Sequence, residues 1–430
     1  MKSILLGFLM INTGTLAAAL GAEQASDYFI IRVLDQDTGR GVPLVELTLS
    51  NEVKYWTDSA GVAALHEPSL EGRDVFVHVR SHGYTLAQET PFGVGSTLKI
   101  ESGKTHELRV QNTMPAERLY RLTGEGIYRD SVMAGLAVPM QQPLLNAGVF
   151  GQDTVSATLY RGKLFWIWGD TVGTDFWNFS VSAATSSPDD NPSVAVNYHY
   201  FTDDQGHAKP MLPLAGEGMV WIEGLITLKD PRGEERLIAS YTRQDGLQFP
   251  DECGLALFDD ASALFKPWHS MPCHSEHYSS HPFLHEGYWY FYPWLRVPNR
   301  WDAVQDPKQW QTREVQWQLN GKRPASVVWN EFRQRWILLS EASGSVYYAE
   351  AKAPEGPYGK SVEIIRHDNY NFYNVATHAF FNQENGRVIY LEGTYTDSFS
   401  NAKEKTPRYN YNQIMYRLQL DDARLREAQQ

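Results

Sequence analysis

The sequence predicts an all-β protein whose main body is a five-bladed β-propeller, preceded by a smaller β-domain. One unit, made of a polar residue, an apolar strand, a turn and an aromatic or aliphatic strand, occurs five times between residues 150 and 422. The polar residues recur every 45 to 70 positions, close to one four-stranded sheet each. A two-sheet sandwich would not need the same order five times. The units open at Asp153, Glu223, His281, Ser326 and His378.

The composition limits the classes of partner. At 430 residues the chain is long enough for two or three domains. A net charge of -13 argues against nucleic acid and against a polybasic membrane surface. Aromatic residues make up 13% of the chain, which suits stacking on sugar rings, although all-β cores are aromatic for their own reasons. We therefore expect a carbohydrate partner, no nucleic acid and no membrane insertion.

Residues 1–22 have the pattern of a secretory signal peptide. Lys2 precedes an apolar run, and small residues at Ala17–Ala19 or Leu20–Ala22 offer a cleavage site. The apolar run is too short to span a membrane. We therefore expect a periplasmic or secreted protein. In an oxidising compartment Cys253 and Cys273 can form a disulfide, and two free buried thiols are the alternative.

Residues 27–112 read as an all-β domain of short strands with turns at DTGRG and DSAG. The pattern VxDxxTGxGVPxVxxxLS resembles the carboxypeptidase regulatory-like or prealbumin-like β-sandwich, an Ig-like shape. That resemblance implies an accessory module without an active site. Residues 113–149 mix Pro, Gly and short apolar pieces and are predicted to be a connector, whereas 423–430 form a tail.

The segment from Gly151 to Thr171 carries the first candidate site. Asp153 precedes a strand, the turn at residues 161–163 follows, and an aromatic strand ends at Asp170. Ends of paired strands lie side by side, so both aspartates should emerge at one edge of the sheet. Two carboxylates held close together can cleave a glycosidic bond. The alternative is that both residues cap turns.

The other candidates follow from the propeller geometry. The innermost strand of each blade lines the central channel, so the polar residues that open the units should converge at one face. Glu223 is predicted as an assisting acid, with a surface residue as the alternative. His281 and His378 could bind substrate hydroxyls, hold a metal with carboxylates or shuttle protons, or be structural. Glu392 and Arg296 should approach the same face from the next shell. The predicted substrate contacts are His281, His378, Arg296, Tyr278, Trp177 and Glu392.

The pieces GQD, GKLFWIWGDT and WNFSVSAATS resemble the first blade of five-bladed propeller glycosidases of the endo-D-arabinanase type. The resemblance implies that Asp153 and Asp170 are the catalytic pair. Related propeller glycosidases carry an acid on blade three, where this chain has His281. That departure opens a second reading, a polysaccharide lyase with His281 or His378 as base, Tyr278 or Tyr198 as acid, and Arg296 on a uronate. A non-catalytic carbohydrate-binding propeller is the third.

Other chemistries lack their sequence patterns. The chain has no GxSxG, HExxH or GxxxxGK[ST] segment. We therefore predict a secreted glycoside hydrolase of polysaccharides that needs no cofactor, with a structural or channel metal such as calcium left open.

Overall fold

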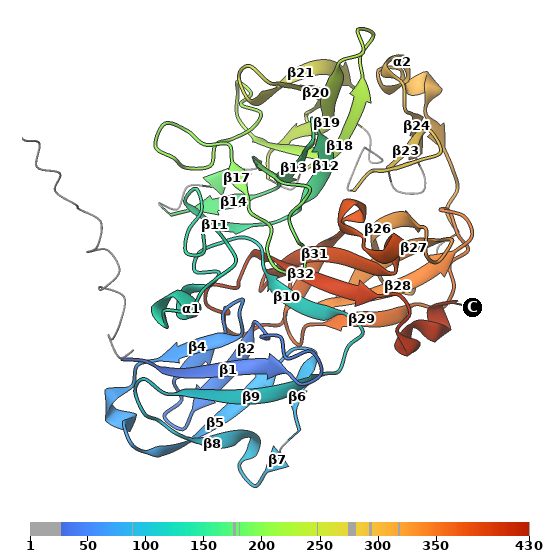
Figure 1. Cartoon of the computed structure of the whole chain (residues 1–430). Helices are drawn as coiled ribbons and strands as arrows, with labels where there is room; N and C mark the ends of the chain where they lie inside the picture. The colour runs from blue at the N-terminus through green and yellow to red at the C-terminus, as the bar shows by residue number, and fades with distance from the viewer. Residues whose placement is uncertain are drawn as a thin grey trace, which may run out of the picture.

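The computed structural model describes residues 27–87, 89–174, 178–179, 181–246, 248–273, 281–291, 295–316 and 319–429. The described chain is nearly all β and forms two bodies, a propeller and a smaller N-terminal domain packed against it (Figure 1). The predicted signal peptide, Tyr278 and Trp177 lie outside the described residues.

The N-terminal domain is one nine-stranded sheet folded around a single apolar core. Its main path runs β3-β2-β5-β6-β9-β1-β4, with β8 on β5 and β7 on β8, and the β1–β9 pair is parallel. Alternation in β5 turns Val75, Val77 and Val79 into the core. Hydrogen bonds join all nine strands, so two separate sandwich sheets are not seen here. The strands are β1 (Phe29–Asp35), β2 (Val45–Leu49), β3 (Lys54–Trp56), β4 (Val62–Leu65), β5 (Asp74–Ser81), β6 (Tyr84–Leu86), β7 (Glu89–Thr90), β8 (Gly93–Lys99) and β9 (Thr105–Asn112).

Five four-stranded antiparallel sheets form the blades, which confirms the predicted five-bladed propeller. Blade one is β12 (Ser156–Tyr160), β13 (Lys163–Trp168), β16 (Ser182–Ser186) and β17 (His199–Tyr200). Blade two is β18 (Met219–Lys229), β19 (Glu235–Gln244), β20 (Glu252–Asp259) and β21 (Leu264–Met271). Blade three is β22 (Phe283–His285), β23 (Tyr288–Phe291), β24 (Leu295–Pro298) and β25 (Gln311–Thr312). Blade four is β26 (Arg323–Asn330), β27 (Arg335–Ala342), β28 (Ser345–Ala351) and β29 (Val362–Arg366).

Blade five closes the ring with a strand from the predicted connector. Its order is β30 (Asn371–Thr377), β31 (Val388–Thr396), β32 (Asn412–Gln419) and β10 (Glu117–Arg121). β10 pairs antiparallel with β32, for example Glu117 with Arg417. Residues 113–149 are therefore more than a connector, because their strand completes the last blade. A small sheet of β11 (Val149–Gln152), β14 (Thr171–Gly173) and β15 (Asn178–Phe179) lies beside blade one.

The helices are short. Two are α-helical, α1 (Arg129–Met133) and α2 (Trp301–Val304). The 3-10 turns are η1 (Pro68–Leu70), η2 (Pro307–Gln309), η3 (Ala379–Phe381), η4 (Glu384–Gly386) and η5 (Ala423–Gln429). η5 falls in the predicted tail, yet Leu425 and Ala428 are buried in the core of blades four and five. Within the described residues, no helix is long and apolar enough to cross a membrane.

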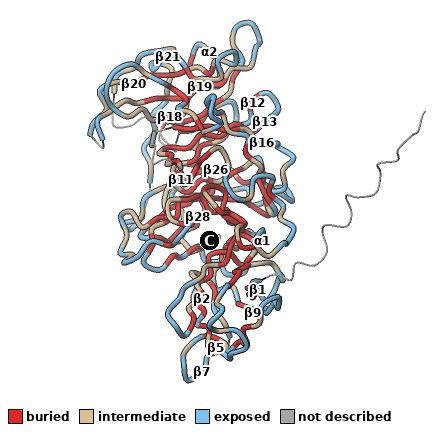
Figure 2. Tube along the Cα trace, turned by 90° about the vertical axis from the view of Figure 1, so that its left-hand side faces the viewer, coloured by how far each residue is buried: buried red, intermediate tan, exposed pale blue. Residues whose placement is uncertain are grey.

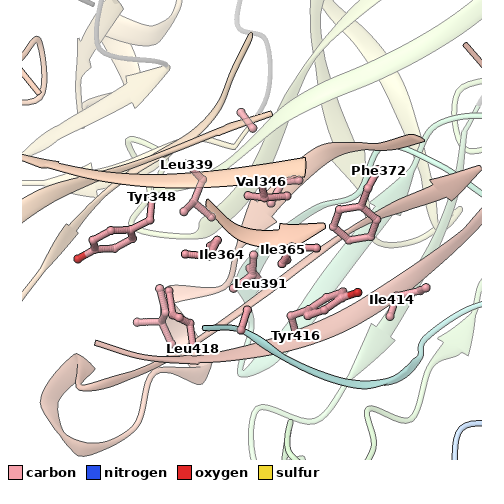
Figure 3. Close-up of a cluster of buried hydrophobic side chains, with 14 of the residues drawn as sticks. Leu339, Val346, Tyr348, Ile364, Ile365, Phe372, Leu391, Ile414, Tyr416 and Leu418 are labelled. Atoms are coloured by element: carbon pink, nitrogen blue, oxygen red, sulfur yellow. The ribbon is translucent and has the colours of Figure 1, made fainter. Parts of the chain in front are cut away.

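Apolar clusters fill the spaces between neighbouring blades. The cluster between blades four and five includes Leu339, Val346, Phe372 and Tyr416 (Figure 3). The cluster between blades five and one is built around the stacked indoles of Trp166 and Trp168. Facing blades therefore bury their sheets against each other, which fixes how their innermost strands meet at the axis.

The contact between the two domains is well packed and rich in hydrogen bonds. Arg118, on β10, is 1% exposed, and its guanidinium donates to the carbonyls of Pro43 (3.0 Å) and His82 (2.8 Å). The Tyr409 hydroxyl donates to the carbonyl of Thr57 at 2.7 Å. Figure 2 shows buried residues in both bodies and at their junction. A buried arginine with satisfied donors requires both surfaces in place, so the domains hold one relative position.

Cys253, at the start of β20, and Cys273, just after β21, form a disulfide with a Cα–Cα distance of 5.3 Å. Of the two sequence alternatives, the bonded one is therefore found.

Candidate active site

Asp153 and Asp170 meet where the small sheet joins blade one. The backbone N–H of Asp153 donates to the carbonyl of Asp170 at 3.2 Å, and Gly169 N–H donates to the carbonyl of Asp153 at 2.8 Å. The expectation that both aspartates emerge at one edge is confirmed. Gly169 leaves room for the pair, because a Cβ there would lie 2.6 Å from Asp153 Oδ1.

Asp153 is held by hydroxyl donors from blade five. Tyr373, in β30, donates to Asp153 Oδ2 at 2.7 Å, and Tyr411, just before β32, also hydrogen-bonds this carboxylate. Burial raises the pKa of Asp153 above its usual value, and these hydrogen bonds oppose that rise only in part. Burial, together with the nearby Asp153 charge, raises the pKa of both tyrosines, so they stay protonated as donors.

Asp170 has a different environment. Burial first, and then the charge of Asp153, raise the pKa of Asp170 to about 6. The indole N–H of Trp221 on β18 donates to Asp170 Oδ1 at 3.2 Å and partly opposes that rise in pKa. Asp170 is therefore the member that holds a proton in mildly acidic solution, and Asp153 is the member provided with donors for its anion.

A cavity of about 150 Å³ lies beside Thr154, and residues of all five blades line it. Glu223 and His281 are among them, so the predicted convergence is confirmed for these two side chains. Asp153 and Asp170 lie next to this lining rather than in it. The full lining is Thr154, Val155, Ser156, Ile222, Glu223, His281, Arg323, Pro324, Ala325, Glu341 and Asn374.

Blade four contributes a carboxylate, Glu341, to the cavity wall. Glu341 is 5% exposed and accepts from Arg323 Nε at 2.9 Å and from the backbone N–H of Val375 at 3.2 Å. Burial raises the pKa of Glu341, and the guanidinium of Arg323 opposes that rise. Asn374 donates to Thr154 Oγ1 at 2.6 Å, which joins this wall to blade one.

His378 and Glu392 do not line this cavity. His378 Nε2 and Glu392 Oε1 are 2.6 Å apart, and the two residues are 2% and 0% exposed. The imidazole packs edge-on against Trp166 at 5.1 Å, in the interface of blades five and one. The placement of His378 at the start of blade five is therefore wrong, because β30 ends at Thr377 and the following Ala379–Phe381 is a 3-10 turn.

Tyr373 holds the position in blade five that was assigned to His378. The innermost strands of blades two and five bulge just after Glu223 and Tyr373, and Gly224 and Asn374 there have φ of +64° and +52°. In blade one Thr154, with φ of +49°, follows Asp153 in the same way. A residue with positive φ follows each of Asp153, Glu223 and Tyr373, so these three residues occupy equivalent places. In the sequence, the signal that could have identified the positions in blades two and five is an Asn or Gly directly after a polar or aromatic residue.

Arg296 is not brought to the cavity. It lies on β24, the third strand of blade three, where its guanidinium packs over the Tyr288 ring at 4.4 Å and donates to Gln311 Oε1 at 2.7 Å. Arg296 was expected to approach the channel face, and its place on the third strand of the blade lies too far from the axis for that.

No group of three or more His, Cys, Asp or Glu side chains in the described part of the chain is arranged to hold a metal ion. The calcium alternative stays a prediction.

Comparison with known proteins gives matches among solved structures. No family model and no curated protein matches this chain. An arabinanase from Bacillus subtilis is 10% identical, with 62% of this chain and 93% of that chain covered and a TM-score of 0.35. A GH43 enzyme from Xanthomonas citri complexed with xylotriose is 12% identical, with coverages of 63% and 86% and a TM-score of 0.36. An exo-β-1,3-galactanase from Phanerochaete chrysosporium is 10% identical, with coverages of 71% and 65% and a TM-score of 0.38. We transfer no residue role from similarity at this level.

Proposed function

We propose that this protein is a glycoside hydrolase that cleaves a polysaccharide with Asp170 as the acid and Asp153 as the ionised carboxylate. The observation that carries the proposal is the contrast between these two neighbouring carboxyls. Burial raises the pKa of both, to about 6 for Asp170, but Asp153 accepts hydrogen bonds from two tyrosines, whereas Asp170 accepts one from the Trp221 indole. Pairs of carboxyls with divergent environments are how glycosidases separate the acid from the base.

In this mechanism protonated Asp170 donates its proton to the oxygen of the glycosidic bond as that bond breaks. Ionised Asp153 activates a water molecule or attacks the anomeric carbon. The hydroxyls of Tyr373 and Tyr411 hold the Asp153 carboxylate in place. Glu223, on the equivalent position of blade two, assists from the cavity wall. The resemblance of the blade-one segments to endo-D-arabinanase-type propellers points to the same pair.

The polysaccharide lyase is less well supported. Burial, and secondarily the charge of His378, lower the pKa of His281 to about 3. A base with that pKa takes up a proton poorly near neutral pH. His378 is enclosed with Glu392, and Arg296 lies on an outer strand. Within the described residues these three do not assemble as a base and a carboxylate clamp.

Export is part of the proposal. The disulfide between Cys253 and Cys273 supports an oxidising compartment, in agreement with the signal pattern of residues 1–22.

The test is a polysaccharide panel that includes arabinan, xylan and β-1,3-galactan, read for new reducing ends and for the ultraviolet absorbance of unsaturated uronates. We expect reducing ends alone, and loss of turnover in Asp153→Asn and Asp170→Asn. Full activity in both variants would show that the pair is not catalytic. Ultraviolet-absorbing products would favour the lyase, and binding without turnover would favour the carbohydrate-binding propeller.

A further inference from the structure

A cleft of about 580 Å³ lies between the two domains. The N-terminal domain supplies one wall, with Trp56 and Lys54 on β3 and Arg80 and Ser81 on β5. Blade five supplies the other wall, through the loop 368–370 before β30 and the loop 401–406 before β32. A volume of this size is in the range of small-molecule and oligosaccharide sites, and domain interfaces are where such sites occur most often.

The base of the cleft is built from fixed side chains. His82 Nε2 lies 3.2 Å from the Tyr395 hydroxyl, and His82 Nδ1 accepts from the backbone N–H of Asp368 at 2.9 Å. Tyr370 stacks on Tyr395 at 4.2 Å. Buried Arg118 donates from below to Ser81 Oγ at 2.7 Å and to the His82 carbonyl. Both walls are therefore held in position by the protein's own contacts, so binding costs little reorganisation.

The lining suits a polyhydroxylated ligand. Trp56 is half-buried and contributes an aromatic surface, while Asn369 and Asn401 contribute exposed amides. The charges are largely paired, with Arg80 2.9 Å from Glu46 within the N-terminal wall and Lys54 3.3 Å from Glu404 across the cleft. Paired charges give donors and acceptors for hydroxyl groups without the excess positive charge that a phosphate or nucleic acid needs.

The cleft and the catalytic pair share two segments of blade five. Tyr370 lines the cleft, and Tyr373, three residues on and roughly 10 Å along the strand, donates to Asp153. The loop after β31 lines the cleft at residues 401–406 and returns at Tyr411, which bonds Asp153. A chain of sugars that leaves the catalytic pair along these two segments of blade five therefore runs toward the cleft.

We propose that this interdomain cleft is a second carbohydrate site that binds the polysaccharide away from the bond being cleaved. The inference rests on the proposed glycoside hydrolase activity, and it gives the N-terminal domain a part in substrate binding. Trp56 provides the stacking surface, and Lys54 with Asn401 binds hydroxyls from the two walls.

The test uses the full-length protein and the polysaccharide on which it shows turnover, with a trisaccharide of the same linkage as the short substrate. In Trp56→Ala we expect the ratio of kcat/KM on polymer to kcat/KM on trisaccharide to fall roughly 5- to 10-fold, as for loss of one central aromatic contact. Lys54→Ala, on an exposed side chain, should lower the same ratio by a smaller factor without risk to the fold. Phe92→Ala, which removes a 74% exposed aromatic ring at the β7–β8 turn of the same domain, is the matched control and should leave the ratio unchanged.

Affinity electrophoresis in gels containing each polysaccharide separates this proposal from the proposed function. Asp153→Asn should lose turnover and keep its retardation, whereas Trp56→Ala should lose retardation. If no polysaccharide is cleaved but one retards the wild type and not Trp56→Ala, the hydrolase proposal fails and the cleft proposal stands. An unchanged kinetic ratio in both cleft variants, or no retardation by any polysaccharide, would overturn the cleft proposal.

Discussion

Replacing Tyr373 with phenylalanine removes the hydroxyl that donates to Asp153 Oδ2 at 2.7 Å and leaves the aromatic ring. A hydrogen bond to a charged group contributes about 1.5–3 kcal/mol. Tyr411 still donates to the same carboxylate, and Asp153 is only half-buried, so the lower end of that range applies. A loss of about 1.5 kcal/mol corresponds to about one pKa unit.

The direction in which the pH profile should move follows from the proposed role of Asp153 as the ionised carboxylate. Losing a donor to the carboxylate raises the pKa of Asp153, so the acid limb of the pH profile of kcat/KM should move up by about one unit. At a fixed pH on that limb, kcat/KM should fall about tenfold. Because Asp153 and Asp170 interact, the two limbs report the pair rather than either residue alone.

The assay is kcat/KM against pH on the cleaved polysaccharide, with thermal unfolding to confirm that the fold is kept. Tyr347→Phe, on the third strand of blade four, is the matched control and should reproduce the wild-type profile. If the acid limb of Tyr373→Phe coincides with that of the wild type and kcat/KM changes less than about twofold, Asp153 is not the ionised catalytic carboxylate.

Three further outcomes are expected. In the proposed mechanism Asp170 must be protonated to act, so activity should be lost as pH rises through its pKa of about 6. Asp170→Asn should abolish that basic limb of the pH profile and lower kcat by about 10²–10⁴-fold. If the variant keeps the basic limb, the limb belongs to another group. Gly169→Ala places a Cβ 2.6 Å from Asp153 Oδ1 and should lower kcat/KM by about 100-fold. Gly359→Ala, whose Cβ would lie 3.3 Å from its nearest neighbour, is the control and should leave kcat/KM unchanged. Equal kcat/KM values for the two variants would contradict the packing argument. Glu392→Ala leaves buried His378 without its partner and should cost about 3–5 kcal/mol in urea unfolding, and Glu392→Gln should cost clearly less; wild-type stability of Glu392→Ala would refute the structural role.

Blade one could be predicted from the sequence because its signals are local. The turn at Gly162 joins two strands with β-forming residues, and Asp153 and Asp170 stand at their outer ends. Antiparallel pairing then brings the two residues together without any knowledge of the rest of the chain. The same local argument placed Glu223 and His281 correctly at the cavity.

The prediction for the first strand of blade five was wrong because of a bulge in that strand. The bulge at Asn374 interrupts the alternation of side chains in NFYNVAT, so the strand lacks a regular period of two. The apolar piece Ala379–Phe381 reads more like a strand, and the opening residue of the unit was placed at His378, five residues after Tyr373. Tyr373 was therefore passed over, and His378 took its place among the candidates.

The partners of Asp153 depend on contacts that no local pattern encodes. Tyr411 has φ of +61° in a loop, and its carbonyl accepts from the backbone N–H of Gln152 at 2.9 Å. The side chain of Gln413 donates to the Gln152 carbonyl at 3.3 Å. These bonds join the first blade to the last across more than half the length of the chain, so they exist only once the ring is closed.

Ring closure thus bears directly on the proposed chemistry. Asp153 and Asp170 both come from the blade-one region, and by themselves they are two neighbouring carboxyls with no difference in role. The difference arises because Trp221 of blade two bonds Asp170 while Tyr373 and Tyr411 of blade five bond Asp153. β10 holds blade five in place through β32, and Arg118 on that strand also anchors the N-terminal domain. The strand that closes the propeller therefore connects the proposed catalytic pair to the domain that we propose binds the rest of the substrate.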